Sequence, residues 1–277
     1  MEEKETRLRR AIREMGSVVV SYSGGVDSVL VLKISSEELG ERALGVMGVS
    51  LSMARCDLEE ARITAAGFGA RLKEVETGEF RSEAYLRNDG DRCFLCKQEL
   101  VARLGETAES GCFAFVLDGF NADDVLEHRP GQEAARLAGV RSPLADAGLR
   151  KSEVRELLRM QGVAVWNRPA TPCLSTRVAQ GIRLEPALLE RIEEAERRVR
   201  RAVKEVTDLR VRHLGPKAVV QADLKHVPSL MRRWDEIGRS LRELGWREVV
   251  LDELGYRRGS MSAPGRSPES GGDDIPR

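Results

Sequence analysis

Phosphate chemistry is indicated by the segment SGGVDS at residues 23–28. Its two glycines allow backbone amides to approach an oxyanion, and the hydroxyls of Ser23 and Ser28 add further donors. A helix that begins here would also direct its positive N-terminal end at the anion. The segment lacks the lysine and the spacing of a Walker A loop. An ordinary strand-to-helix turn that is capped by Asp27 or Ser28 is the alternative interpretation.

Metal or sulfur chemistry is indicated by three cysteines. Cys93 and Cys96 are spaced i, i+3 at an expected helix start, so they would share one face and could bind one metal or one cluster. Cys173 follows later, in the segment RPATPCLSTR. Zinc normally takes four ligands and no histidine lies near these segments, whereas three thiolates suit a [4Fe–4S] cluster with an exchangeable ligand on its fourth iron. Two buried thiols or a redox pair are the alternatives.

The remaining two cysteines, Cys56 and Cys112, fall on an apolar helix face and in an expected strand, so we interpret both as core residues. An odd total of five cysteines argues against a disulfide framework. The charged N-terminal sequence does not resemble a signal peptide, and no segment approaches the roughly 20 consecutive apolar residues of a membrane helix. These features predict a cytoplasmic protein without a membrane partner.

Composition narrows the class of protein. The chain has 277 residues, of which 41% are hydrophobic and 32% charged, as in a soluble globular protein of one or two domains. Lysine plus arginine and aspartate plus glutamate both count 45, so there is no bulk basic bias to neutralise phosphates. Aromatic residues make up only 4% of the chain. Both observations argue against a nucleic-acid partner.

Strands and helices alternate in the first part of the chain. Short links join them, so the pattern predicts an α/β fold with a doubly wound parallel sheet. Ligands bind beyond the carboxyl ends of such strands, which is where SGGVDS and the segment DGFNADD (118–124) fall. The expected strands are 17–22, 43–50 and 112–120, and the expected helices are 2–15, the segment after SGGVDS, 54–67, 93–108 and 151–162.

The pattern changes after about residue 178. A charged helix is followed by two strands, a helix and a strand, which predicts a smaller α+β domain. The last segment is rich in Ser, Gly and Pro and is expected to be disordered. The predicted elements here are a helix at 185–204, strands at 209–214 and 218–223, a helix at 228–244 and a strand at 246–252. The predicted divisions are 1–177, 178–257 and a tail at 258–277.

Several segments together resemble a known family. SGGVDS matches the PP-loop of the N-type ATP pyrophosphatases at every fixed position, and those enzymes cleave ATP between its α- and β-phosphates to adenylate a substrate oxygen. NDGDRCFLCK, DGFNADDVLEHRPG, GLRKSEVRELL, NRPATPCLSTRVAQG and LRVRHLG follow in order and resemble the LarE-type ATP-dependent sulfur transferases. That family converts the carboxylates of a pyridinium-3,5-dicarboxylate mononucleotide to thiocarboxylates, on the route to the nickel-pincer nucleotide cofactor of lactate racemase and related enzymes.

The resemblance implies an ATP and Mg²⁺ site. Asp123 and Asp124 would help to hold Mg²⁺ or position the nucleotide, although a capped loop would explain them equally well. Lys151 resembles a lysine that approaches phosphate in related enzymes, and a surface helix start is the alternative. Asp27 is expected to be essential for pyrophosphate release. The residues expected to hold the pyrophosphate of ATP are Ser23, Gly24, Gly25, Asp27 and Ser28.

The resemblance also implies a substrate site. Arg177, Arg210 and Arg212 are candidates for the phosphate and carboxylates of the mononucleotide. Arg210 and Arg212 alternate along an expected strand and would project to one face, as a bidentate anion clamp requires. Two solvated arginines are the alternative. The small C-terminal domain is also a candidate contact for a homo-oligomer.

Cys173 is implied to handle the sulfur. In family members that have only this cysteine, its thiolate attacks the acyl adenylate and later loses its Cβ–S bond, which leaves dehydroalanine. Members that also have a CxxC are similar to cluster-dependent tRNA thiolases, in which three cysteines hold [4Fe–4S] and sulfide on the open iron is delivered. Since this chain has Cys93, Cys96 and Cys173, we favour a cluster supplied with sulfide or another sulfur donor. A tRNA thiolase or similar nucleotide-modifying enzyme, and a zinc-stabilised ATP-binding module without turnover, are the rival functions.

Overall fold

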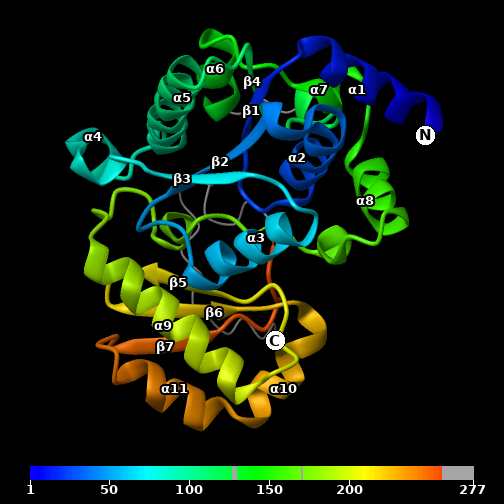
Figure 1. Cartoon of the computed structure of the whole chain (residues 1–277). Coiled ribbons are helices and arrows are strands. Elements are labelled where there is room, and N and C mark those ends of the chain that lie inside the picture. The colour runs from blue at the N-terminus through cyan, green and yellow to red at the C-terminus, as the bar shows by residue number, and fades with distance from the viewer. Residues whose placement is uncertain (127–129, 170, 258–277) are drawn as a thin grey trace, which may run out of the picture. The chain divides into compact units, whose positions relative to one another are not determined.

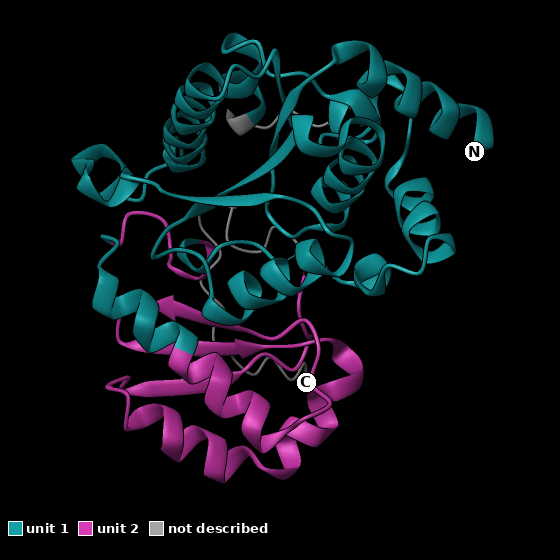
Figure 2. Cartoon of the chain, viewed as in Figure 1, with its two compact units in different colours: residues 1–175, 183–193 teal, residues 176–182, 194–277 magenta. Residues whose placement is uncertain are grey.

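The computed structural model describes residues 1–126, 130–169 and 171–257 (Figure 1). The tail predicted at 258–277 therefore lies outside the described residues. The chain divides into two compact units (Figure 2): unit 1 is Met1–Ser175 with Arg183–Glu193, and unit 2 is Thr176–Ile182 with Glu194–Arg277.

The division between the units differs from the expected boundary after residue 177. The chain returns to unit 1 over Arg183–Glu193, because Leu184 donates a backbone hydrogen bond to Leu86 (2.8 Å) and Arg183 forms an ion pair with Glu83. A single boundary could not be read from the sequence, since these contacts join residues about a hundred positions apart.

Unit 1 is built on a parallel four-stranded sheet with the order β3-β2-β1-β4, which confirms the predicted α/β class. The sequence analysis missed β3 because charged residues interrupt its apolar ones, as on an exposed edge. It also placed the last strand over 112–120, whereas β4 is only three residues long. The strands are β1 (Val18–Ser21), β2 (Ala43–Val49), β3 (Leu72–Glu76) and β4 (Phe115–Leu117).

Helices cover both faces of this sheet (Figure 1). Val18 and Val20 of β1 pack into one apolar cluster with residues of α1, α2, α3 and α8, whereas Val19 packs into a second cluster with residues of α5. Successive residues of a strand point to opposite faces, so β1 is buried on both sides and the sheet is doubly wound. The helices are α1 (Glu2–Met15), α2 (Val26–Leu39), α3 (Arg55–Gly67), α4 (Glu83–Leu86), α5 (Arg92–Ser110), α6 (Pro130–Leu137), α7 (Pro143–Asp146) and α8 (Lys151–Met160).

Short 3-10 turns connect these elements. The turn η2 follows β3 and packs against α4 and α5, which makes it part of the surroundings of the cysteines. The 3-10 turns are η1 (Gly40–Arg42), η2 (Glu79–Arg81), η3 (Asp124–Leu126), η4 (Ala164–Asn167), η5 (Leu174–Arg177) and, in unit 2, η6 (Leu224–His226).

Unit 2 has a three-stranded sheet with helices, which confirms the predicted α+β domain. β5 (Arg210–Leu214) is antiparallel to β6 (Lys217–Gln221), and β7 (Glu248–Leu251) is parallel to β6. The helix predicted at 228–244 is divided at Arg233 into two helices, of which the second buries Ile237 and Leu241. The helices are α9 (Pro186–Ala202), α10 (Val227–Arg232) and α11 (Trp234–Arg242).

Candidate functional site

The SGGVDS loop joins β1 to α2. Gly24 has φ +72, and a Cβ added there would lie 2.6 Å from the Cβ of Ala61. Only glycine fits this position, for both conformational and steric reasons. Gly25 is the extended N-cap residue of α2, so the amides of the first helical turn follow directly after the loop. Ser23 and Gly25 are exposed, which leaves the loop accessible to an anion.

Hydrogen bonds of the Ser28 hydroxyl join the two serines of the loop to each other and to Gly25. The Ser28 hydroxyl accepts from the Ser23 amide (3.2 Å) and donates to the Gly25 carbonyl (3.0 Å), and its Oγ lies 3.2 Å from the Ser23 Oγ. Ser28 is buried and therefore shapes the loop. Ser23 is the serine whose hydroxyl remains exposed toward a ligand.

Asp27, in the first turn of α2, forms an ion pair with the ammonium group of Lys151. Its other carboxylate oxygen accepts from the Asn121 side-chain amide at 3.3 Å. Burial raises the pKa of Asp27, and the positive charge of Lys151 opposes this change. The charge of Asp124 raises the same pKa further. Lys151, which was expected to approach phosphate, therefore lies at the SGGVDS loop and balances the charge of the Asp27 carboxylate.

Asn121 organises the segment that follows β4 and was missed by the sequence analysis. Its side-chain oxygen accepts from the amides of Asp123 (2.9 Å) and Asp124 (3.3 Å), and its own amide donates to the Asp124 carboxylate (3.2 Å). The Asp123 carboxylate accepts from the amide of Lys151 at 2.8 Å, where α8 begins. Asp123 therefore performs the capping role that was the alternative interpretation. The signal for Asn121 was its place after a strand of a parallel sheet.

The two predicted loops meet at Gly119. A Cβ at this position would lie 2.8 Å from the Ser28 amide and 3.1 Å from the Asp27 Cβ. The segment 118–124 therefore packs closely against the start of α2. Asn121 therefore lies within reach of Asp27, and Lys151 reaches the same carboxylate from the start of α8.

Arg168 is a second residue that the sequence analysis missed. Its guanidinium donates to the Gly24 carbonyl (3.4 Å) and to the Asp57 carboxylate (2.7 Å), and it lies 3.0 Å from the carboxylate of Glu60. The side chain is mostly buried. The available signal for Arg168 was its place in the sequence, directly before Pro169 in the segment that contains Cys173.

The three predicted cysteines lie within electrostatic reach of one another in unit 1. Cys93 in the first turn of α5 is exposed, and Cys96 and Cys173 are half-buried. Burial raises the pKa of Cys96 to about 12, and the charges of Glu79, Cys173 and Cys93 raise it further. Within the described residues, no group of three or more His, Cys, Asp or Glu side chains is arranged to hold a single metal ion.

Hydrogen bonds hold the segment of Cys173 in place. The Leu174 amide donates to the Ser52 carbonyl (2.7 Å), and the buried Ser175 hydroxyl lies 3.0 Å from the Tyr85 hydroxyl. Arg92 donates to the Ser175 carbonyl (2.9 Å) and to the Cys93 sulfur (3.8 Å). Arg92 therefore supplies positive charge between the segments that carry Cys93 and Cys173.

Lys97 lies close to both Cys96 and the 118–124 segment. It follows Cys96 in α5, and its ammonium group lies 6.0 Å from the centre of the Phe120 ring in the 118–124 segment. Burial lowers the pKa of Lys97, while the charge of Asp118 opposes this change. A lysine with a partly buried ammonium group thus lies between the two candidate sites of unit 1.

The prediction for the other two cysteines was wrong. Cys56 and Cys112 are both exposed. Cys56 lies in the first turn of α3, and Cys112 has φ +53 in the turn that ends α5, before β4 begins. Apolar neighbours in the sequence suggested burial, but the turn directs Cys112 away from the core.

Three buried arginines lie together in unit 2. Their burial excludes the alternative that Arg210 and Arg212 are two solvated arginines. Arg177, Arg210 and Arg212 are 1%, 3% and 6% exposed. Arg177 forms an ion pair with Glu196 (3.0 Å), and the Tyr256 ring lies 5.1 and 5.8 Å from the guanidinium carbons of Arg210 and Arg212. Burial and the charge of Arg177 lower the pKa of both strand arginines, that of Arg212 to about 10.

This cluster has the chemistry of an anion site. Arg212 donates to the Gln221 side chain (3.0 Å) and the Thr176 carbonyl (2.8 Å), both of which are neutral acceptors. Since neighbouring arginines repel one another, a bound phosphate or carboxylate would offset their charge and accept paired hydrogen bonds.

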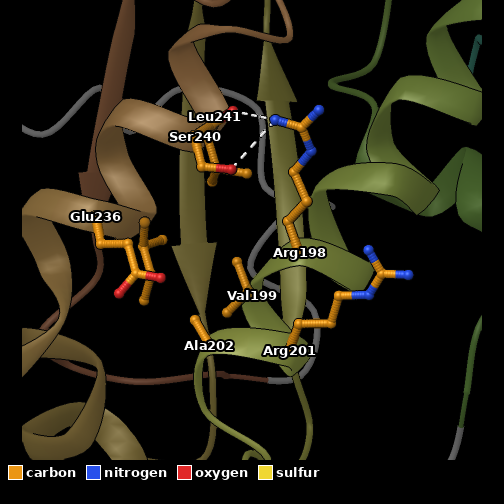
Figure 3. Close-up of a pocket in the computed structure, with 8 residues that line it drawn as sticks. Arg198, Val199, Arg201, Ala202, Glu236, Ser240 and Leu241 are labelled. Carbon is orange, nitrogen blue, oxygen red and sulfur yellow. Dashed lines mark hydrogen bonds between the residues drawn. The ribbon is translucent and has the colours of Figure 1, made fainter.

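A separate hollow of about 220 Å³ in unit 2 contains none of the predicted residues. It lies between α9 and α11, and Figure 3 shows Arg198 donating to the Ser240 carbonyl (2.8 Å) and hydroxyl (3.2 Å) there. These bonds join two helices, and the hollow is a packing feature. In the described residues, no helix has the length and apolar character of a membrane span.

Comparison with known proteins gives relatives along nearly the whole chain. The chain is 33% identical to the uncharacterized protein slr1717 of Synechocystis, over 95% of this chain and 98% of the relative. It is 30% identical to the pyridinium-3,5-bisthiocarboxylic acid mononucleotide synthase of Lactiplantibacillus plantarum, over 94% of each. An uncharacterized protein of Methanocaldococcus jannaschii, MJ0830, is 28% identical over 87% of this chain and 90% of the relative. No family model matches.

Proposed function

The chain belongs to the LarE family of sulfur transferases, and we propose that it uses ATP to adenylate and then thiolate the carboxylates of a pyridinium-3,5-dicarboxylate mononucleotide. The observation that carries this proposal is that Asp27 of the glycine-rich loop bonds to Lys151 and Asn121. These residues belong to the same unit as the three cysteines. Adenylation and sulfur transfer are the two steps that such a pair of sites would perform.

Adenylation would occur at the loop. A carboxylate is a poor electrophile, and transfer of AMP to it creates a good leaving group. The amides at the start of α2 and the exposed Ser23 hydroxyl would hold the phosphates, and Lys151 would turn from Asp27 to the charge that develops on pyrophosphate. When bound, Mg²⁺ would neutralise the same phosphates. Asp27 and Asp124, whose charges interact, offer the oxygen donors that this ion prefers.

The mononucleotide would be recognised by the arginines of unit 2. Arg177, Arg210 and Arg212 carry positive charge that burial makes costly, and the phosphate and carboxylates of the substrate would offset it. Guanidinium groups bind both kinds of anion through paired hydrogen bonds. Tyr256 would keep the two strand arginines in position.

Sulfur transfer would occur at the cysteines. Cys93, Cys96 and Cys173 are soft donors within electrostatic reach, and a four-iron cluster spaces its ligands more widely than a single ion does. The residues therefore fit [4Fe–4S], which when bound would offer one iron for inorganic sulfide. Arg92 would stabilise the cysteine thiolates, and Lys97 would face the acyl adenylate. We prefer this route to the sacrifice of Cys173 because all three cysteines are present.

The test is turnover by the full chain, purified without oxygen and supplied with Mg²⁺, ATP, sulfide and the mononucleotide. We expect about four irons per chain, repeated formation of thiocarboxylate, and release of AMP and pyrophosphate. Cys93→Ala should lose most of the iron, whereas the exposed Cys112 replaced by serine serves as the matched control. Iron-free protein that makes one product and loses the mass of H₂S would replace the cluster with Cys173 as donor. Absence of pyrophosphate release would overturn the proposal.

A further inference from the structure

Glu79 is a buried carboxylate that the proposed steps do not use. It lies in the turn η2 after β3, and it is 3% exposed. Neither of its carboxylate oxygens has a hydrogen-bond partner within the described residues. A carboxylate withdrawn from water in this way is costly unless it is paired or binds a metal.

The surroundings of Glu79 place it at the cysteine site. Its turn packs against α5, and the Gly78 amide beside it donates to Glu99 of that helix at 3.0 Å. Phe80, the next residue of this turn, packs edge-on against the ring of Tyr85 in α4, with the ring centres 5.2 Å apart. Tyr85 in turn lies 3.0 Å from the hydroxyl of Ser175, two residues after Cys173.

The nearby hydrogen-bond donors have other acceptors. Arg92 bonds to the Ser175 carbonyl, the Asn88 side chain and Cys93, and the Tyr85 hydroxyl contacts Ser175. Arg92 and Tyr85 thus use their donors elsewhere, while the carboxylate of Glu79 has no hydrogen-bond partner within the described residues. This arrangement is expected where a group that is not part of the protein completes the site.

We propose that Glu79 is the fourth protein ligand of the cysteine site, where it binds the iron that the three cysteines leave open and yields this position to hydrosulfide. The inference rests on the proposed function. In the exchange, the iron–oxygen bond to Glu79 breaks and an iron–sulfur bond forms with an electron pair from hydrosulfide. The carboxylate leaves with its own pair, and no oxidation state changes.

The chemistry of the donors explains why this ligand is replaceable. A carboxylate is a hard donor, whereas the cysteine thiolates and hydrosulfide are soft donors that iron–sulfur clusters prefer. Glu79 would hold the open iron while no sulfide is present, and hydrosulfide would displace it without affecting the cysteines. A fourth cysteine in the place of Glu79 would instead block the position.

The experiment uses the full chain, reconstituted with iron and sulfide without oxygen and labelled with ¹³C in the side-chain carboxyl of glutamate. In the reduced cluster, electron–nuclear double resonance should detect a carboxyl carbon coupled to the iron in the wild type. The coupling should be absent in Glu79→Gln and present in Glu99→Gln, the matched control from the same surroundings. Hydrosulfide should remove it in the wild type, and Glu79→Gln should need about tenfold less hydrosulfide for half-saturation.

The outcomes separate this inference from the function on which it rests. A wild-type cluster without the carboxyl coupling, or equal hydrosulfide affinity in the wild type and Glu79→Gln, overturns the role of Glu79 alone. A wild-type chain that assembles no four-iron cluster overturns both. If Glu79→Gln does not fold, Glu79→Asp replaces it, and its shorter side chain should weaken the coupling and lower the hydrosulfide needed. An unchanged coupling in that variant contradicts the proposal.

Discussion

Two carboxylates of unit 1, the half-buried Asp27 and the buried Glu79, differ in how their charge is balanced. Asp27 in the phosphate loop has Lys151 and Asn121 as partners, whereas Glu79 beside Cys96 has no hydrogen-bond partner within the described chain. The charge of Asp27 is therefore balanced without a ligand, and in the proposed mechanism Lys151 changes partner when ATP binds. The cysteine site is incomplete until another group supplies positive charge. The loop thus balances its charge with side chains of the protein, whereas the cysteine site needs a bound group to balance its charge.

Removal of Cys173 should have the largest effect and should separate the two sites. Whether Cys173 binds a cluster or donates its sulfur, Cys173→Ala should make no thiocarboxylate above background. The loop lies outside this change, so pyrophosphate and the acyl adenylate should still form. Product mass and pyrophosphate are measured in parallel, with Cys56→Ser as the exposed control. Full thiolation by Cys173→Ala would show that sulfur transfer does not depend on this residue.

Asp27→Ala should reduce pyrophosphate release by at least about 100-fold, because catalytic positioning of phosphate charge is worth this much. The variant loses a donor for Mg²⁺ and the partner that holds Lys151. Iron content should stay unchanged, since Asp27 bonds to Lys151 and Asn121. Asp235→Ala, at an exposed position of unit 2, is the control. Release at the wild-type rate would remove the loop from the reaction.

Arg212→Lys should raise the KM for the mononucleotide about tenfold and leave the KM for ATP unchanged, because a lysine cannot form the paired bonds of a guanidinium. The pKa of Arg212 is lowered to about 10 by burial and by Arg177. Its charge is thus present at neutral pH at a cost to the folded state. Substrate affinity should fall as pH rises through about 10, where this charge is lost. An affinity that is flat across this range would contradict the assignment.

Gly24→Ala should destabilise the protein by about 1–3 kcal/mol and weaken ATP binding, because the new Cβ would collide with Ala61 in a left-handed backbone conformation. Gly16 offers a close comparison, since its φ is +75 but nothing lies within 4 Å of an added Cβ. Gly16→Ala should cost only the conformational part, about 1 kcal/mol. Thermal unfolding and ATP titration measure both. Equal losses in the two variants would remove the steric argument.

Glu79→Gln should change stability in the opposite direction to Gly24→Ala. In the protein without a cluster, removal of an uncompensated buried charge should stabilise the fold by about 1–3 kcal/mol. Asp27→Asn should destabilise it, because Lys151 would lose its partner. Chemical unfolding of the iron-free proteins measures both changes. A loss of stability in Glu79→Gln would show that its carboxylate has a partner in the fold.

Local sequence determined the elements and the chemistry that they carry. A compact apolar, β-branched run and the glycine-rich turn were enough to predict β1, the SGGVDS loop and α2, because a strand end, Gly24 and a helix start are properties of a few adjacent residues. The spacing of Cys93 and Cys96 likewise follows from one helical turn. These features needed no knowledge of distant contacts.

Tertiary structure alone decided which of these residues meet and which are buried. Lys151 reaches Asp27 across more than a hundred residues, and Asn121 and Arg168 join the loop from other segments. No local pattern marks Glu79 as buried, because its burial depends on how η2 packs against α4 and α5. Periodicity reports the faces of one element, whereas charge compensation depends on several elements folded together.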